Sequence, residues 1–169
     1  MNKSQENGTS GTGAWIFQGN PAWYDIIRAV TEQGRLVWGV KQCSRQIAPG
    51  DRVYLWASGP KGGVIARGVT LDTPSQRPLF SDQYTLDTSR NQTGPGVEIQ
   101  ITDRCVDRPF SRSMMLADRR LSGSSILTFP NATNYKLTLE QAGLLDSYFE
   151  GVYHNTAPVE EEQKAEALE

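Results

Sequence analysis

The sequence contains too little cysteine and histidine for most catalytic and metal-binding chemistry. Its two cysteines, Cys43 and Cys105, are too few for a disulfide framework or a zinc site. The single histidine, His154, stands at the edge of an acidic segment, which argues against Ser-His-Asp catalysis, Cys-His catalysis and histidine-based metal sites. We therefore expect a protein with no metal and no cofactor.

Long hydrophobic runs are also missing. The sequence has no stretch of about 18 apolar residues and no signal peptide, so a cytoplasmic protein without membrane contact is expected. The apolar share of 37% is low, and the ends of the chain account for part of this. Residues 1–13 and 154–169 lack apolar periodicity and are expected to be disordered, the second as an acidic tail or linker. This leaves residues 14–153 as a single folded domain.

The expected domain differs in net charge from the whole chain. Residues 159–169 contain five Glu and one Lys, a net charge of −4, whereas the whole chain carries −2. The remainder is therefore mildly basic, at +2. Such a charge permits binding to nucleic acid without requiring it.

Short apolar segments separated by turns predict an α+β fold. Residues 14–18 are expected to form a strand, followed by a helix with Asn20 as its N-cap, Trp23 on its apolar stripe and Gly34 at its end. Residues 72–96 are predicted to be a long polar loop. Further strands are expected at 35–40, 53–57, 64–71 and 97–106, helices at 111–121 and from Thr138 to about Phe149, and a loop at 129–135. Five or six strands with two or three peripheral helices indicate a small curved barrel.

Aromatic and amide side chains concentrate in the first forty residues. Gln18 and Asn20 follow the first strand, where amide donors and acceptors can face a ligand. Trp38 lies near the end of the second predicted strand. Its ring is equally suited to packing in the core and to facing an open ligand site. Trp15 is open to both interpretations, whereas Trp23 on its stripe is predicted to be core. Amides beside flat aromatic rings are suited to holding a flat, hydrogen-bonding ring.

Enzymatic interpretations find little support. Residues 58–63 lack the Gly-x-x-x-x-Gly-Lys-Ser/Thr pattern of a phosphate loop. A magnesium-dependent nuclease would need Asp87 and Glu98 as ligands, with Gln100 standing where a lysine would be expected. A solvated loop and the outer face of a strand explain these residues better, so a non-catalytic protein is predicted.

Five segments spread over most of residues 14–150 carry a further signal: WIFQGNP at 15–21, VWGV at 37–40, PGDRVYLWASG at 49–59, GVIARG at 63–68 and NATNYKLT at 131–138. Together, and in this order, these segments resemble the EVE family, and the last one resembles the way those domains end. The resemblance implies a PUA-like pseudo-barrel, related to the YTH domains that bind methylated adenine in RNA.

The resemblance also implies a function. Several EVE domains stand at the N-terminus of McrB-like, modification-dependent restriction proteins, where they recognise a modified DNA base. A binding module that takes a flipped, methylated base into an aromatic pocket is therefore expected, with DNA favoured over RNA. A C-terminal GTPase motor and a nuclease are the partners implied. A modified-RNA reader of the YTH kind and a sensor of small molecules or nucleosides remain alternatives.

Pocket residues follow from the same resemblance. Trp38 matches the aromatic wall, and the turn with Gln18 and Asn20 matches the region that reads the base edge. Trp56 and Ser58 are expected to form an adjoining wall. Two residues of the long loop are candidates to close the pocket, Phe80 and Tyr84. The candidate phosphate contacts are Lys41, Arg45, Lys61, Arg112, Arg119 and Arg120.

Overall fold

The computed structural model describes residues 13–156 of the 169-residue chain. Within this part, eight strands form one sheet and four α-helices pack around it. The segments expected to be disordered, 1–13 and 154–169, lie outside the described residues except for Gly13 and residues 154–156. None of the described helices is long and apolar enough to cross a bilayer.

Strands and helices follow one another with short connections. The strands are β1 (Ala14–Gly19), β2 (Arg35–Gly39), β3 (Arg52–Ala57), β4 (Gly63–Thr70), β5 (Ser75–Leu79), β6 (Gln92–Arg104), β7 (Phe110–Ser111) and β8 (Asn134–Lys136). The helices are α1 (Ile26–Glu32), α2 (Arg112–Ala117), α3 (Ser125–Thr128) and α4 (Leu139–Phe149), with a 3-10 helix η2 (Thr88–Arg90).

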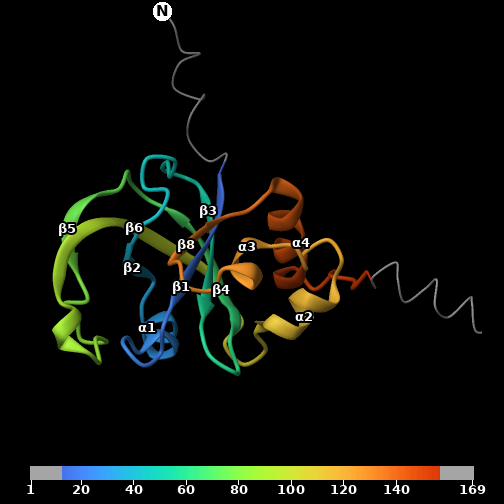
Figure 1. The fold of residues 1–169 in the computed structure, drawn as a ribbon, viewed down its shortest axis with the longest axis horizontal. Helices are drawn as coiled ribbons and strands as arrows, with labels where there is room; N and C mark the ends of the chain where they lie inside the picture. The colour runs from blue at the N-terminus through green and yellow to red at the C-terminus, as the bar shows by residue number, and fades with distance from the viewer. Residues whose placement is uncertain (1–12, 157–169) are drawn as a thin grey trace, which may run out of the picture.

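The sheet is mixed and curled. Its strand order is β2-β6-β4-β3-β1-β8, with β5 paired to the first part of β6 and β7 to the start of β4. Strands β1 and β3 run parallel, and the other pairs are antiparallel. The long strand β6 arches over one side of the sheet, on the left in Figure 1. The predicted α+β pseudo-barrel is confirmed, with more strands and helices than the sequence indicated.

Two hydrophobic cores lie on opposite faces of the central strands. Side chains alternate along a strand, so Trp15 and Phe17 of β1 enter the core that contains α1, whereas Ile16 enters the other core. In the same way, Leu55 of β3 belongs to the first core and Trp56 to the second. Burial on both faces explains why β1 is apolar without interruption, because only a strand with one solvated face shows polar alternation.

The first helix begins later than predicted. Asn20 instead closes a turn: its carbonyl oxygen accepts from the Trp23 N–H at 3.0 Å and its side-chain oxygen accepts from the Ala22 N–H at 2.9 Å. The helix α1 starts only at Ile26. Trp23 is therefore not a core residue; it is half-buried, with the Arg90 guanidinium 3.2 Å from its ring centre. An Asn favours turns and N-caps through the same side-chain bond, so the sequence could not separate the two.

Residues 72–96 are not the long loop that was predicted. Strand β5 pairs with β6 from Ser75 opposite Gly96 to Leu79 opposite Gln92. Of the residues in β5, only Leu79 is buried, so this arm of the sheet lacks the apolar alternation that marks a strand. The predicted loop 129–135 likewise contains the first residues of β8.

The last helix begins where the sequence predicted. The Thr138 hydroxyl accepts from the Gln141 N–H at 3.1 Å, and the Gln141 side-chain oxygen accepts from the Thr138 N–H at 3.0 Å. This reciprocal pair is a capping box. Ala142 and Leu145 are buried beneath the helix, while Leu139, predicted on the same face, is exposed.

Candidate functional site

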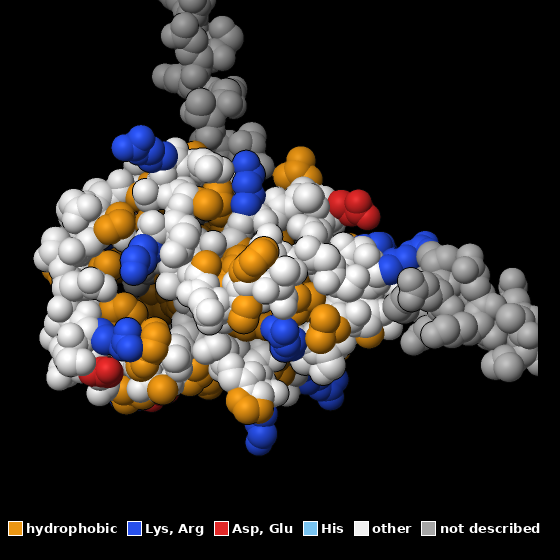
Figure 2. Space-filling view, in the orientation of Figure 1, with side chains coloured by type: hydrophobic (Ala, Val, Ile, Leu, Met, Phe, Trp, Pro, Cys, Tyr) orange, Lys and Arg blue, Asp and Glu red, His pale blue; other side chains and the backbone are white. Residues whose placement is uncertain are grey.

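A cavity of about 260 Å³ opens where the ends of β1 and β2 meet the arm formed by β5 and β6. Its lining is mainly apolar, with a few polar side chains. Figure 2 shows the hollow on the left of this face, bordered by hydrophobic side chains. Among the residues that line it are Gln18, Asn20, Tyr24, Trp38, Lys41, Leu79, Phe80, Asp82, Gln92 and Thr93.

Trp38 forms part of both the core and the cavity wall. It lies near the end of β2, opposite Val97 of β6, and is 7% exposed. Gly19, at the end of β1, leaves room for the indole, because a Cβ there would come within 3.2 Å of the ring. The sequence predicted core packing and a ligand platform equally for Trp38; in the structure Trp38 packs in the core and also lines the cavity, and its role as a ligand platform stays a prediction.

An aromatic cluster continues from Trp38 along one side of the cavity. The Tyr24 ring stands edge-on to the rings of Trp38, Phe80 and Tyr84, with centroids 6.4, 6.3 and 6.3 Å apart. The Tyr24 hydroxyl donates to Asp82 Oδ2 at 2.7 Å. Burial, and then the hydrogen bond to Asp82, raises the pKa of Tyr24, so its hydroxyl stays a neutral donor at ordinary pH.

The side-chain amides of Gln18 and Asn20, near the end of β1, differ in which hydrogen-bonding atoms remain available to a ligand. Both hydrogens of the Gln18 side-chain amide are used, donating to Pro130 O at 2.8 Å and Ala132 O at 2.7 Å. Gln18 therefore holds the loop before β8 against the cavity and can offer a ligand only its side-chain oxygen. Asn20 uses its side-chain oxygen in the turn, and no hydrogen bond among residues 13–156 uses its Nδ2 group.

The predicted adjoining wall is not found beside this cavity. Trp56 is 3% exposed and packs in the core beneath α2, α3 and α4, on the opposite face of β3 from Leu55. The Ser58 N–H donates to Gly19 O at 2.9 Å, so Ser58 braces the end of β1 without lining the cavity. The second aromatic surface is supplied instead by Tyr24 and Phe80.

The two residues predicted to close the pocket divide between two places. Phe80 lines the cavity and has a backbone φ of 52°, a conformation that L-residues seldom adopt. Tyr84 is buried behind Tyr24, and its hydroxyl donates to Glu32 at 2.8 Å and accepts from the Gln33 amide at 2.7 Å. Tyr84 lines a second, more open depression, which Phe80 also lines.

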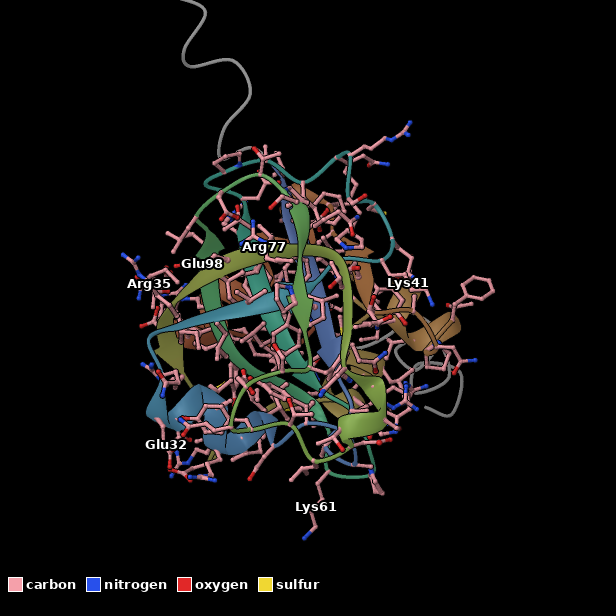
Figure 3. All side chains as sticks on the ribbon, turned by 90° about the vertical axis from the view of Figure 1, so that its left-hand side faces the viewer. Glu32, Arg35, Lys41, Lys61, Arg77 and Glu98 are labelled. Carbon is pink, nitrogen blue, oxygen red and sulfur yellow. The ribbon has the colours of Figure 1, made fainter. Side chains whose placement is uncertain are left out.

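The candidate phosphate contacts do not form one surface. Lys41 is exposed and lines the cavity, and Arg45 is exposed on the same connection. Lys61 lies at the bottom of the view in Figure 3, well away from Lys41. The remaining arginines lie near the C-terminal part of the described chain: Arg120 is paired with Asp118 at 2.8 Å, Arg112 donates to Leu127 O at 3.3 Å, and the Arg119 side chain is exposed.

The acidic residues weighed for a nuclease lie in separate environments. Asp87 accepts from the Ser89 N–H at the start of η2. Glu98 pairs with Arg35 at 3.5 Å, on the side of the molecule opposite Lys41 in Figure 3. Within residues 13–156, no three His, Cys, Asp or Glu side chains gather closely enough to hold a metal ion.

Several residues that line the cavity were not predicted as site residues, among them Tyr24, Leu79 and Asp82. Tyr24 was hidden in the predicted helix, and the other two in the predicted loop. A signal was present in the isolated aromatic Phe80 next to Leu79, since large apolar residues in a polar stretch indicate contact with the domain. No local pattern marks Asp82, because its role depends on the distant Tyr24.

Comparisons with known proteins bear on the fold. No protein-family model and no curated protein matches the chain. A hypothetical protein from Leishmania major matches with a TM-score of 0.62 and 14% identity, over 82% of this chain and 95% of that one. Protein Atu2648 from Agrobacterium tumefaciens matches with a TM-score of 0.61 and 15% identity, over 87% of this chain and 99% of that one.

A third similar structure is human THYN1, solved in complex with DNA that contains 5-methylcytosine. Its TM-score is 0.56 at 15% identity, covering 82% of this chain and 98% of that one. This chain has the fold of these proteins. Sequence identities of 14–16% show a shared fold only, so the function of this domain must be argued from its cavity.

Proposed function

We propose that this domain binds DNA containing a modified base, and that it holds the base, turned out of the duplex, in the cavity beside Trp38. The cavity carries the proposal, because it is concave, mainly apolar, walled by aromatic rings and furnished with a few polar groups. The shared fold with THYN1, solved with 5-methylcytosine DNA, supports the choice of DNA. Membership of the EVE family, which the sequence resembles, is part of the same proposal.

The size and lining of the cavity suit one base. Its volume of about 260 Å³ is below the roughly 300–1,000 Å³ of sites for drug-sized ligands. Turning a base out of a duplex costs a few kcal/mol. Stacking on an aromatic side chain returns about 1–3 kcal/mol per base, and hydrogen bonds to the base edge supply the remainder.

The modification itself is proposed to be read by apolar contact. Val37, Leu79 and Pro95 line the cavity together with the aromatic rings. A methyl group moved from water to such a surface gains about 0.8 kcal/mol, which corresponds to roughly fourfold tighter binding. A larger preference would require that the cavity be filled poorly when the methyl group is missing.

Contacts to the phosphate backbone are proposed for two exposed cations: Lys41, which lines the cavity, and Arg45, which lies on the same connection. Such contacts add affinity that depends on salt and not on sequence. Lys61, Arg112, Arg119 and Arg120 lie elsewhere or are already paired, so they are weaker candidates.

In its biological setting, such a domain would be the specificity module of an McrB-like restriction or defence system. A GTPase motor and a nuclease would then act on the DNA that this module selects. This extension is supported only by the resemblance of the sequence to the EVE family.

Binding of labelled duplexes, followed by fluorescence anisotropy, tests the proposal. Matched duplexes would carry cytosine, 5-methylcytosine, 5-hydroxymethylcytosine, adenine or N6-methyladenine at one position. We expect one modified duplex to bind at least fourfold more tightly than its unmodified partner, and 2-aminopurine placed beside the base to brighten as it unstacks. Equal binding of all duplexes would contradict the proposal, while preference for modified RNA or for the free nucleoside would favour the alternatives.

A further inference from the structure

Among the described residues 13–156, Asp82 is the only acidic side chain that lines the cavity, and it is held in place at both oxygens. Its Oδ2 accepts from the Tyr24 hydroxyl at 2.7 Å, and its Oδ1 accepts from the Tyr84 N–H at 2.9 Å. Each carboxylate oxygen has two acceptor sites, so one site on each oxygen is left for a ligand. Asp82 is thus a fixed acceptor at the edge of the cavity.

The carboxylate is also fixed relative to the aromatic wall. Tyr24 donates to Asp82 and stands edge-on to Trp38 at 6.4 Å and an interplanar angle of 87°. A base stacked against Trp38 would therefore meet Asp82 at a defined place on its edge. Two rotatable side chains would lose entropy on binding a base, but this pair is ordered beforehand.

Asn20 supplies the complementary group. Its side-chain oxygen accepts from the Ala22 N–H at 2.9 Å, which orients the amide and uses one of the two acceptor sites of that oxygen. The Nδ2 group is engaged in no hydrogen bond among residues 13–156, and Asn20 lines the cavity. The polar groups of the cavity thus include an anionic acceptor in Asp82 and a neutral donor in Asn20.

We propose that Asp82 accepts a hydrogen bond from the exocyclic amino group of the bound base, while Asn20 donates to the base. The domain would then select cytosine-type or adenine-type bases over bases with a keto oxygen at that position. The inference rests on the proposed function. Carboxylates read the amino group of cytosine in the same chemical sense in DNA grooves. A keto oxygen facing Asp82 would instead bring two acceptors together without a proton between them.

Thymine and 5-methylcytosine separate this inference from recognition of the methyl group. Both carry the same 5-methyl group on a ring of the same shape, but only 5-methylcytosine has an amino group at position 4. The experiment places 5-methylcytosine, thymine or cytosine opposite an abasic site in one duplex, so that no base pair must be broken. Adenine against hypoxanthine provides the same amino-against-keto comparison for purines, because neither base carries a methyl group.

We expect the amino base of at least one pair to bind roughly tenfold more tightly than its keto partner. Asp82→Asn, which keeps the size of the side chain, should reduce that ratio to within about twofold. Tyr24→Phe is a second variant, which removes the hydroxyl that positions Asp82 and should reduce the ratio partway. Asp107→Asn is the matched control: it changes the net charge equally at an exposed residue away from the cavity and should leave the ratio unchanged.

The ratio of affinities is the readout because loss of a negative charge strengthens binding to any DNA. The wild-type protein could prefer 5-methylcytosine over cytosine and yet bind thymine as tightly as 5-methylcytosine. That result would overturn the Asp82 inference and leave the proposed function standing. The same holds if Asp82→Asn leaves the amino-over-keto ratio intact. If no modified base is preferred over its unmodified counterpart, the proposed function itself is overturned and the inference with it.

Discussion

Replacement of Trp38 gives the sharpest test of the cavity, provided that the substituted side chain preserves the core. Trp38 is 7% exposed and packs in the same core as Trp15 and Phe17. Truncation of a buried tryptophan to alanine costs about 3–5 kcal/mol, which is a large share of a typical total stability of about 5–15 kcal/mol. Trp38→Ala would therefore mix unfolding with loss of binding. Trp38→Leu retains apolar volume and removes the flat ring.

The expected effect on binding follows from the stacking energy. Stacking of one base on an aromatic side chain contributes about 1–3 kcal/mol, so Trp38→Leu should weaken binding to the modified duplex by about 5- to 150-fold. Trp38→Phe keeps an aromatic face and should lose much less. Binding is measured by fluorescence anisotropy, and urea unfolding followed by circular dichroism shows how much of each variant is folded.

Trp56→Leu is the matched control. Trp56 is 3% exposed, belongs to the other core and does not line the cavity. It should lose a similar amount of stability but keep its affinity for the modified duplex. A folded Trp38→Leu variant that binds like the wild type would refute the stacking role, and so would an equal loss of affinity in Trp56→Leu.

Three further predictions concern charge, capping and acid stability. Lys41→Ala should reduce the slope of log affinity against log salt by about 1, as measured by anisotropy at several salt concentrations, whereas Lys61→Ala should not. Thr138→Ala should lower the free energy of unfolding in urea by about 1 kcal/mol through loss of the capping box, with DNA affinity unchanged. Burial alone would raise the pKa of Asp118, but hydrogen bonds from Arg120 and Tyr153 outweigh it and lower the pKa to about 2. An Asp in an unfolded chain has a pKa near 3.9. The ionised Asp118 should therefore contribute roughly 2 kcal/mol to the free energy of unfolding above pH 4, and this contribution is lost as the pH falls toward 2. In urea unfolding between pH 2 and 5, the stability of Asp118→Asn should depend less on pH than that of the wild type.

The strands of the central sheet could be predicted because their apolar residues are consecutive in the chain. Residues 14–18 and 53–57 are apolar enough that no other element fits them, and both are strands in the structure. The start of α4 could be predicted for a similar reason, since both members of its capping box lie within one turn of helix. Such elements can be predicted from local patterns because the residues that form them are close both in the chain and in the structure.

The arm formed by β5 and the start of β6 could not be predicted. Its residues are mostly polar and exposed, and its pairing joins Ser75 to Gly96 across a long separation in the chain. The turn at Asn20 was missed for a different reason, because an N-cap and a turn use the same side-chain hydrogen bond. Both errors fall on the walls of the cavity, where segments distant in the chain meet.

The sequence by itself determined the class of fold, the central strands and the cluster of amides and tryptophans near the end of β1. It also indicated Trp38 as a residue that could serve a ligand. Only the tertiary structure decided that Trp38 reaches a cavity while Trp56 does not. A strand pattern shows that side chains alternate between two faces, but the elements that cover each face come from elsewhere in the chain. Here α2, α3 and α4 cover Trp56, whereas the β5–β6 arm brings Phe80 and Asp82 to Trp38 and leaves the cavity open between them.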